Sequence, residues 1–346
     1  MSHSMKAIGL SHYLPVTDEN CLLDITLPLP HPSSRDLLIK VEAISVNPVD
    51  TKVRAPKELV EADAKILGWD AYGTVVSVGN AVTLFSPGQK VFYAGDITRA
   101  GCNSEFHLVD ERIVGHAPEK LSSEQAAAIP LTALTAWEAM FNRMGITLEG
   151  ALPGDSSQKN ILIIGGAGGV GSMACQLASN LAGLTVIATA SRPESIAWCK
   201  DMGADYIVNH HDLMADMRAL SINKVDFILC CNDTDMHFDN MAELIAPQGH
   251  ICSIVENAQP LTLNKLKTKS ASFSWEFMFT RAMFKTDDMI EQHHILNEVA
   301  RLLDEGILKT TLKEVLTPIH AQNLRTAHAK LEQGRMIGKL VLSAWE

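Results

Sequence analysis

A glycine-rich turn between an apolar run and a helical pattern is the feature that most restricts what this chain can fold into. Residues 161–164 are all apolar, as in a strand buried on both faces, and a helical pattern follows over 172–181. Between them, Gly166, Gly168 and Gly171 fit the spacing G-x-G-x-x-G. A strand, this turn and a helix in succession predict a βαβ unit that holds the pyrophosphate of a dinucleotide.

The whole turn is predicted to contact the cofactor, because Ala167, Gly169 and Val170 complete the loop whose backbone N–H groups face the phosphates. No Gly-Lys-Ser or Gly-Lys-Thr follows, which excludes ATP binding of the Walker type. The alternative reading is a glycine-rich turn with a purely structural role.

The rhythm of strands and helices divides the chain into α/β and β-rich parts. Short β-type runs in the first third indicate a barrel-like unit, and strands alternating with helices after residue 160 indicate a doubly wound parallel sheet. The β-type runs are 37–43, 73–78, 89–93 and 105–109, and the alternating strands are 160–164, 185–189, 206–209, 225–230 and 250–255. A helix at 287–305 and strands at 310–318 and 338–343 are expected to return to the first domain.

The expected domains are therefore a β-rich domain from 1–128, a dinucleotide-binding domain from 129–285, and a return to the first domain over 286–346. Ser122, followed three residues later by Gln125, is predicted to cap a helix between the first two.

Net charge and cysteine usage restrict the possible partners and the expected cellular location. The chain has 346 residues, 47% of them hydrophobic, and a net charge of −11, which disfavours nucleic acid and anionic membranes as partners. The sequence carries neither a signal-peptide pattern nor an apolar run of roughly 20 residues. Seven irregularly spaced cysteines fit a reducing, cytoplasmic location.

The end of the second α/β strand bears on the choice of cofactor. NAD enzymes place Asp or Glu there, about 20 residues beyond the glycines, to bind the ribose hydroxyls. This chain has Ser191 and Arg192 instead. A hydroxyl and a guanidinium suit a 2′-phosphate, so the sequence predicts NADPH. The alternative is an arginine that is merely solvated at the start of a helix.

Nearly end to end, the chain resembles the medium-chain dehydrogenase/reductase superfamily, and within it the quinone oxidoreductase-like branch whose members are often labelled zinc-type alcohol dehydrogenase-like. The resemblance is carried by segments 45–50, 130–136, 167–171 and 338–342. It implies a GroES-like catalytic domain built from both chain ends, a Rossmann domain between them, an active site in the cleft, and a homodimer.

The zinc ligands of that superfamily are missing. The resemblance places a Cys, a His within Gly-His-Glu, and a later Cys or Asp at the catalytic metal. Here the first segment reads Asn47-Pro48-Val49-Asp50 and the second reads Gly68-Trp69-Asp70. A structural zinc needs four close ligands, and the corresponding stretch offers only Cys102. The sequence predicts no metal.

The resemblance also assigns residues to the reacting end of the site. Asn47 and Asp50 are implied to line the site near the nicotinamide, as positioning residues, and Thr135 to approach the nicotinamide. Lys52 stands where some quinone reductases carry Tyr, and is a candidate to stabilise developing charge unless it is simply exposed. Trp69 supplies aromatic area for a flat substrate.

Further cofactor contacts follow from the same resemblance. His210 matches the place where related NADPH enzymes put a Tyr beside the 2′-phosphate. Asn232 follows the fourth strand, where the cofactor ribose lies, and Lys339 belongs to the matching segment near the C-terminus.

The function expected from these features is NADPH-dependent, zinc-independent hydride transfer to a quinone or an α,β-unsaturated carbonyl. Without a metal, hydrogen-bond donors must stabilise the developing oxyanion, and a delocalised acceptor needs less such help than a plain ketone. Two alternatives stay open: a zinc-type alcohol dehydrogenase, and a catalytically silent nucleotide-binding or scaffold protein.

Overall fold

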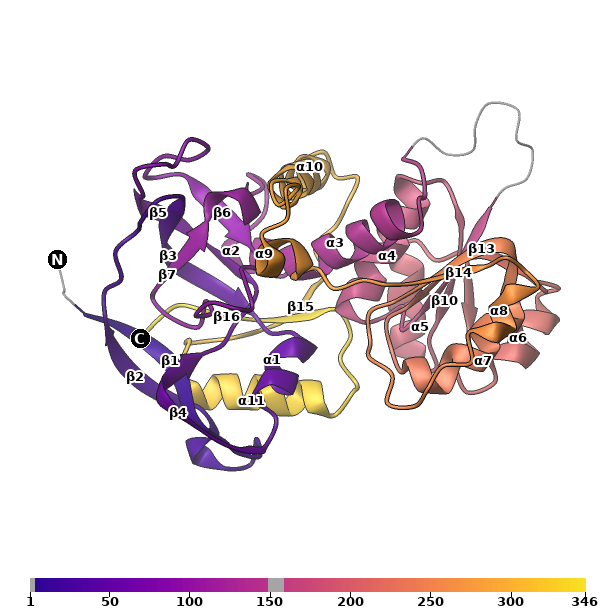
Figure 1. Cartoon of the computed structure of the whole chain (residues 1–346), viewed down its shortest axis with the longest axis horizontal. Coiled ribbons are helices and arrows are strands. Elements are labelled where there is room, and N and C mark those ends of the chain that lie inside the picture. The colour runs from indigo at the N-terminus through magenta and orange to yellow at the C-terminus, as the bar shows by residue number, and fades with distance from the viewer. Residues whose placement is uncertain (1–3, 149–158) are drawn as a thin grey trace. The chain divides into compact units, whose positions relative to one another are not determined.

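The computed structural model describes residues 4–148 and 159–346. The chain forms two compact units: the first consists of Met1–Leu131 and Phe279–Glu346, and the second is Thr132–Met278. In Figure 1 the indigo N-terminal strands and the yellow C-terminal elements belong to the first unit, and the second carries the parallel sheet. Within the ranges described, no helix is both long and apolar enough to cross a membrane.

The larger sheet of the first unit joins strands from both ends of the chain. Its order is β15-β16-β3-β5-β6-β8, and β7 pairs with β3 as well. Strand β16 runs antiparallel to β3, with Val341 opposite Ser45, so this late strand lies in the sheet of the first unit. The strands are β3 (Asp36–Ser45), β5 (Ala71–Val78), β6 (Lys90–Tyr93), β7 (Phe106–Asp110), β8 (Val114–His116), β15 (Leu312–Leu316) and β16 (Lys339–Ser343).

A smaller sheet of order β2-β1-β4 contains β2 and β4, which the sequence pattern did not predict. Its members are β1 (Ser4–Tyr13), β2 (Leu23–Pro28) and β4 (Lys57–Ile66). Strand β4 is rich in Lys, Glu, Ala and Asp, which are depleted in strands, and most of its side chains are exposed. Pairing with β1, which no local pattern reveals, fixes its conformation.

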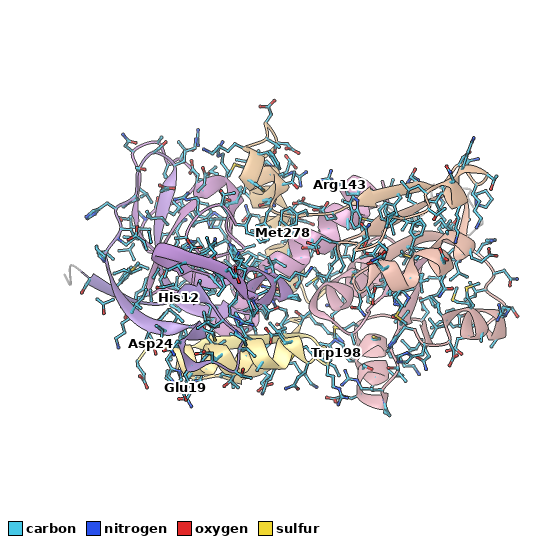
Figure 2. The ribbon with its side chains drawn as sticks, turned by 60° about the horizontal axis from the view of Figure 1, so that its bottom comes forward. His12, Glu19, Asp24, Arg143, Trp198 and Met278 are labelled. Carbon is cyan, nitrogen blue, oxygen red and sulfur yellow. The ribbon has the colours of Figure 1, made fainter. Side chains whose placement is uncertain are left out.

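The helices of the first unit are tied to its sheets by side-chain caps. Ser122 Oγ accepts from Gln125 N (3.2 Å) and Gln125 Oε1 accepts from Ser122 N (3.0 Å), which confirms the predicted cap. Asp24 of β2, labelled in Figure 2, accepts from Ala321 N at the start of α11 (2.9 Å). The elements are η1 (Glu19–Cys21), α1 (Pro48–Arg54), η2 (Glu111–Ile113), α2 (Ser123–Ala127), α9 (Thr280–Phe284), α10 (Glu291–Asp304) and α11 (Ala321–Glu332).

The second unit contains a six-stranded parallel sheet of order β11-β10-β9-β12-β13-β14, the order of a doubly wound dinucleotide-binding fold. Its strands are β9 (Asn160–Ile164), β10 (Thr185–Thr189), β11 (Tyr206–Val208), β12 (Val225–Cys230), β13 (Ile245–Ser253) and β14 (Ser272–Trp275). The predicted bounds of β9, β10 and β12 are confirmed. Strand β13 starts earlier than predicted, because Pro247 and Gln248 (φ 63°), which read as a turn, lie within the strand.

Helices cover both faces of this parallel sheet. They are α3 (Pro130–Trp137), the π-helical segment η3 (Glu138–Arg143), α4 (Gly169–Asn180), α5 (Pro193–Asp201), α6 (Leu213–Ala219), α7 (Thr234–Leu244) and α8 (Asn264–Lys267). One core packs Met217 of α6 and Met241 of α7 against Leu162, Ile187 and Ile228 of the central strands. That packing holds the carboxyl ends of the strands, where such sheets bind ligands, in fixed register.

Candidate active site

A buried polar cluster lies in the first unit, and we call Asn47, Asp50, Asp70 and Lys339 the lysine–carboxylate cluster. Asn47 precedes α1, Asp70 precedes β5, and Lys339 is the first residue of β16. All four side chains are buried. The pairing of β3 with both β5 and β16 brings these three distant stretches together.

Lys339 and Asp70 form the charged centre of the cluster. The Lys339 ammonium donates to Val46 O (2.8 Å), to Asn47 Oδ1 and to Asp70 Oδ2 (3.1 Å). Asp70 also accepts from Asn47 Nδ2 (2.9 Å) and from Leu131 N (2.8 Å). Burial raises the pKa of Asp70 and lowers that of Lys339, and their mutual attraction opposes both shifts.

Asp50 is the least satisfied member of the cluster. Its Oδ2 accepts from Asn47 N (2.7 Å), whereas Oδ1 is buried and has no hydrogen-bond partner among the residues described. Burial raises the pKa of Asp50 to about 7, an effect that the Asn47 N–H and the Lys339 charge only partly oppose. Around neutral pH this carboxyl group can therefore hold or release a proton.

Trp69 supplies a second unsatisfied polar atom next to Asp70. Its indole is buried, and Nε1 has no acceptor within the ranges that the structure covers. The ring packs edge to face against Phe279, with centroids 6.0 Å apart. Because indole N–H is a donor only, Trp69 can serve an oxygen acceptor on a substrate.

Two residues predicted at the reacting end lie outside the cluster. Lys52 is exposed on α1, two positions from the buried Asp50, and therefore on another face of that helix. Thr135 is buried in α3 and belongs to the second unit. Their predicted roles stay predictions.

The glycine turn of the second unit has the geometry that a pyrophosphate requires. Gly165 adopts φ 85°, and a Cβ on Gly171 would lie 2.2 Å from Gly165 O, so neither position tolerates a side chain. Helix α4 begins at Gly169 with Gly168 as its N-cap. Trp198 of α5, labelled in Figure 2, donates from Nε1 to Ser172 Oγ in the first turn of α4 (2.7 Å). The turn thus fits a dinucleotide, with its N–H groups available at the helix start.

The ends of β10 and β11 lie side by side. Thr189 pairs with Val208, and Ala190 N donates to Val208 O (3.0 Å), so Ser191 and Asn209 leave the sheet together. Both line a groove of about 430 Å³. Arg192, the N-cap of α5, follows on one strand end and His210 on the other.

The end of β12 carries Asn232, which the sequence placed near the cofactor ribose. A Cβ on Gly165 would lie 3.4 Å from Asn232 Cβ, so this residue is next to the glycine turn. The neighbouring thiol of Cys230 donates to Asn232 O (3.0 Å), and burial raises its pKa. Cys230 is therefore a structural thiol, as are the other free cysteines that burial keeps protonated.

Comparisons with known proteins identify the family to which this chain is similar. Residues 33–123 match the alcohol dehydrogenase GroES-like domain, and residues 202–342 match the zinc-binding dehydrogenase family. A zinc-type alcohol dehydrogenase-like protein of Staphylococcus epidermidis is 43% identical over 340 residues, which are 98% of this chain and 99% of that protein.

Solved structures give the same result. One from Rhizobium etli CFN 42, provisionally assigned as a zinc-dependent alcohol dehydrogenase, is 49% identical with a TM-score of 0.94 over 100% of both chains. The quinone oxidoreductase of Coxiella burnetii is 27% identical with a TM-score of 0.79, covering 99% of this chain and 100% of that chain.

The first unit is thus a GroES-like domain and the second a Rossmann-like domain, which together define an oxidoreductase. The chain belongs to the medium-chain dehydrogenase/reductase superfamily, among the zinc-type alcohol dehydrogenase-like and quinone oxidoreductase-like proteins. Members of this superfamily use NAD(P)H.

The zinc of the family's name does not fit the residues of the lysine–carboxylate cluster. Lys339 already places a cation 3.1 Å from Asp70 Oδ2, and the thiol of Cys102 donates to Asp70 O (3.4 Å). Burial also raises the pKa of Cys102, so its thiolate is disfavoured. Elsewhere in residues 4–148 and 159–346, no group of three or more His, Cys, Asp or Glu could hold an ion.

Sequence reasoning left Asp70 without a role and placed Lys339 only among the cofactor contacts. The available signal for Asp70 was its position directly after Trp69, in the segment where relatives carry a metal ligand. The signal for Lys339 was its position as the first residue of a strand that is otherwise mostly apolar.

Proposed function

We propose that this protein reduces quinones or α,β-unsaturated carbonyl compounds with NADPH and without zinc. The observation that carries the proposal is the lysine–carboxylate cluster, in which a buried ammonium balances the carboxylates where zinc-dependent relatives carry metal ligands. Oxyanion stabilisation then depends on hydrogen-bond donors, which suffice best for acceptors that delocalise charge.

Trp69 is the proposed donor to the substrate oxygen. Its buried N–H has no acceptor among the residues described, and an unsatisfied buried donor costs about 1–3 kcal/mol. A substrate carbonyl that accepts a hydrogen bond from Nε1 removes this cost. The hydrogen bond becomes stronger when negative charge develops on the carbonyl oxygen.

Asp50 is the proposed proton source. When bound, NADPH supplies the hydride, and reduction of an enone or a quinone requires one proton in addition. The pKa of Asp50 is about 7 and its Oδ1 has no partner in the ranges described, so the protonated carboxyl can give a proton to the oxygen of the enolate or of the hydroquinone anion that hydride transfer leaves, and is then reprotonated from solvent. This role goes beyond the positioning role that the sequence suggested.

The preference for NADPH rests on Ser191 and Arg192 at the end of β10. No carboxylate stands there to bind the ribose hydroxyls of NADH, and a guanidinium can pair with the 2′-phosphate of NADPH.

The test is oxidation of NADPH and of NADH by the purified protein with a panel of quinones, enones, aldehydes and alcohols. We expect turnover with NADPH and with quinones or enones, and strong loss of turnover in Asp50→Asn. Asp63→Asn, on the exposed surface of β4, is the matched control and should retain activity. Turnover that depends on added zinc would instead support an alcohol dehydrogenase, and binding of NADPH without any turnover would support a silent nucleotide-binding protein.

A further inference from the structure

A group of histidines lies beside the strand ends that carry Ser191 and Arg192. Because Thr189 pairs with Val208, His210 leaves β11 at the level where Ser191 leaves β10. The rings of His210 and His211 are 4.0 Å apart between centroids. The backbone of His210 is therefore level with Ser191, where the proposed function places the 2′-phosphate, and His211 follows it.

His237 of α7 adds a third imidazole to this group. Its side chain is fully buried, and neither ring nitrogen has a hydrogen-bond partner among the residues described. It is close enough to His210 and His211 for their charged forms to repel its own. We call His210, His211 and His237 the histidine group.

Two members of the histidine group, His210 and His237, hold positive charge poorly by themselves. Burial and repulsion by His211 lower the pKa of His210, and burial and repulsion by His210 and His211 lower that of His237, which Asp233 partly offsets. At neutral pH the imidazoles of His210 and His237 are thus largely uncharged in the protein without an anion.

The surrounding charges come from several elements. Arg192 is at the end of β10, Asp233 caps α7, and further charged groups lie on α5, at the start of β11 and on α6: Lys200, Asp205, Asp212 and Asp216. Two of the acids are already used by the backbone, since Asp216 Oδ2 accepts from Asn209 N (2.7 Å) and Asp233 Oδ1 from Met236 N (2.9 Å). Asp233 nevertheless keeps its negative charge and already opposes the lowering of the pKa of His237 in the protein without an anion.

We propose that the histidine group takes up a proton when the 2′-phosphate of NADPH binds, so that selection of NADPH over NADH strengthens as pH falls. This inference rests on the proposed function, because it requires the 2′-phosphate at Ser191 and Arg192. A phosphate dianion stabilises the imidazolium form that the neighbouring imidazoles otherwise suppress. Proton uptake makes affinity rise toward lower pH, by at most about tenfold per pH unit for each proton.

Binding of adenosine 2′,5′-bisphosphate and of 5′-AMP, measured by calorimetry between about pH 6.5 and pH 8.5, isolates the 2′-phosphate from the chemistry of the nicotinamide. The lower limit stays above the second ionisation of the phosphate, near about pH 6. As pH falls from about 8.5 to about 6.5, we expect affinity for the bisphosphate to rise at least about threefold and affinity for 5′-AMP to stay constant. Buffers of different ionisation enthalpy should report proton uptake for the bisphosphate alone.

Variants assign the proton to the histidines. His210→Gln with His211→Gln should abolish both the proton uptake and the pH dependence while leaving 5′-AMP affinity unchanged. His12→Gln, labelled in Figure 2 and exposed on β1, is the matched control and should behave like the wild type. His237→Gln should reduce the uptake in part, because it removes one proton acceptor.

The outcomes separate this inference from the proposed function. If NADPH is oxidised but bisphosphate affinity is flat with pH, or the double variant keeps the wild-type dependence, the inference fails and the function stands. If neither NADPH nor the bisphosphate binds at any pH, both fail.

Discussion

Replacing Asp50 by Asn should change the stability of the protein in opposite directions at low and high pH. The wild-type carboxyl is buried, its pKa is about 7, and its Oδ1 has no partner in the described structure. The pKa of Asp50 in the folded protein is raised above the unfolded value of 3.8. Its contribution to the free energy of unfolding is therefore fully present below about pH 4 and is lost as pH rises through 7.

The magnitude follows from the shift. From about pH 5 to pH 7 the folded state keeps a proton that the unfolded state has released, which at about 1.36 kcal/mol per pH unit amounts to about 2.7 kcal/mol. The amide of the Asp50→Asn variant cannot titrate, so the difference in unfolding free energy between variant and wild type should move by about 2–3 kcal/mol in favour of the variant between pH 5 and pH 8.5. The amide oxygen keeps the acceptor for Asn47 N, and the buried NH₂ group costs about 1–3 kcal/mol at every pH.

Urea unfolding followed by tryptophan fluorescence at about pH 5 and at about pH 8.5 measures this difference. Glu276, whose pKa burial and Glu138 raise to about 8, titrates in both proteins and cancels in the comparison. Asp63→Asn should show the same small effect at both pH values. A difference between Asp50→Asn and wild type that does not change with pH would refute the buried, proton-holding carboxyl.

Four other substitutions or treatments test the remaining sites. Purified protein should contain far less than one zinc per chain, and chelators should leave activity intact; stoichiometric zinc with loss of activity on chelation contradicts this. Asn47→Ala should lower kcat and leave NADPH affinity within a small factor, which steady-state kinetics and titration will decide. Arg192→Ala should erode a preference for NADPH of roughly ten- to a hundredfold, worth about 1.5–3 kcal/mol, and fluorescence titration should show NADH affinity nearly unchanged. Lys339→Met should destabilise the protein by about 3–5 kcal/mol in urea, because the Asp70 carboxylate stays buried without its cation, and adding Asp70→Asn should recover much of that loss.

Local patterns were sufficient for the central strands β9, β10 and β12 of the parallel sheet and for its glycine turn. The apolar runs at β9, β10 and β12 are buried on both faces. Such continuous apolar runs, alternating with helices, are typical of the central strands of a parallel sheet. A Cβ on Gly166 or Gly171 would collide with the strand and the loop beside it, so both positions require glycine. The turn was predictable because this requirement appears in the sequence as the glycine spacing. Edge strands β4 and β14 were not predicted, since their conformation depends on a partner strand rather than on their own composition.

The sequence by itself determined the fold class, the dinucleotide turn and the residues at the end of β10, because each depends on neighbours within a few positions along the chain. Only the tertiary structure decided that Lys339 pairs with Asp70 and Asn47, that Lys52 is exposed, and that His237 belongs with His210. Those contacts join residues as far as 292 positions apart. The charge and pKa of a buried group depend on everything that excludes water from it, and that surrounding exists only after the strands have paired.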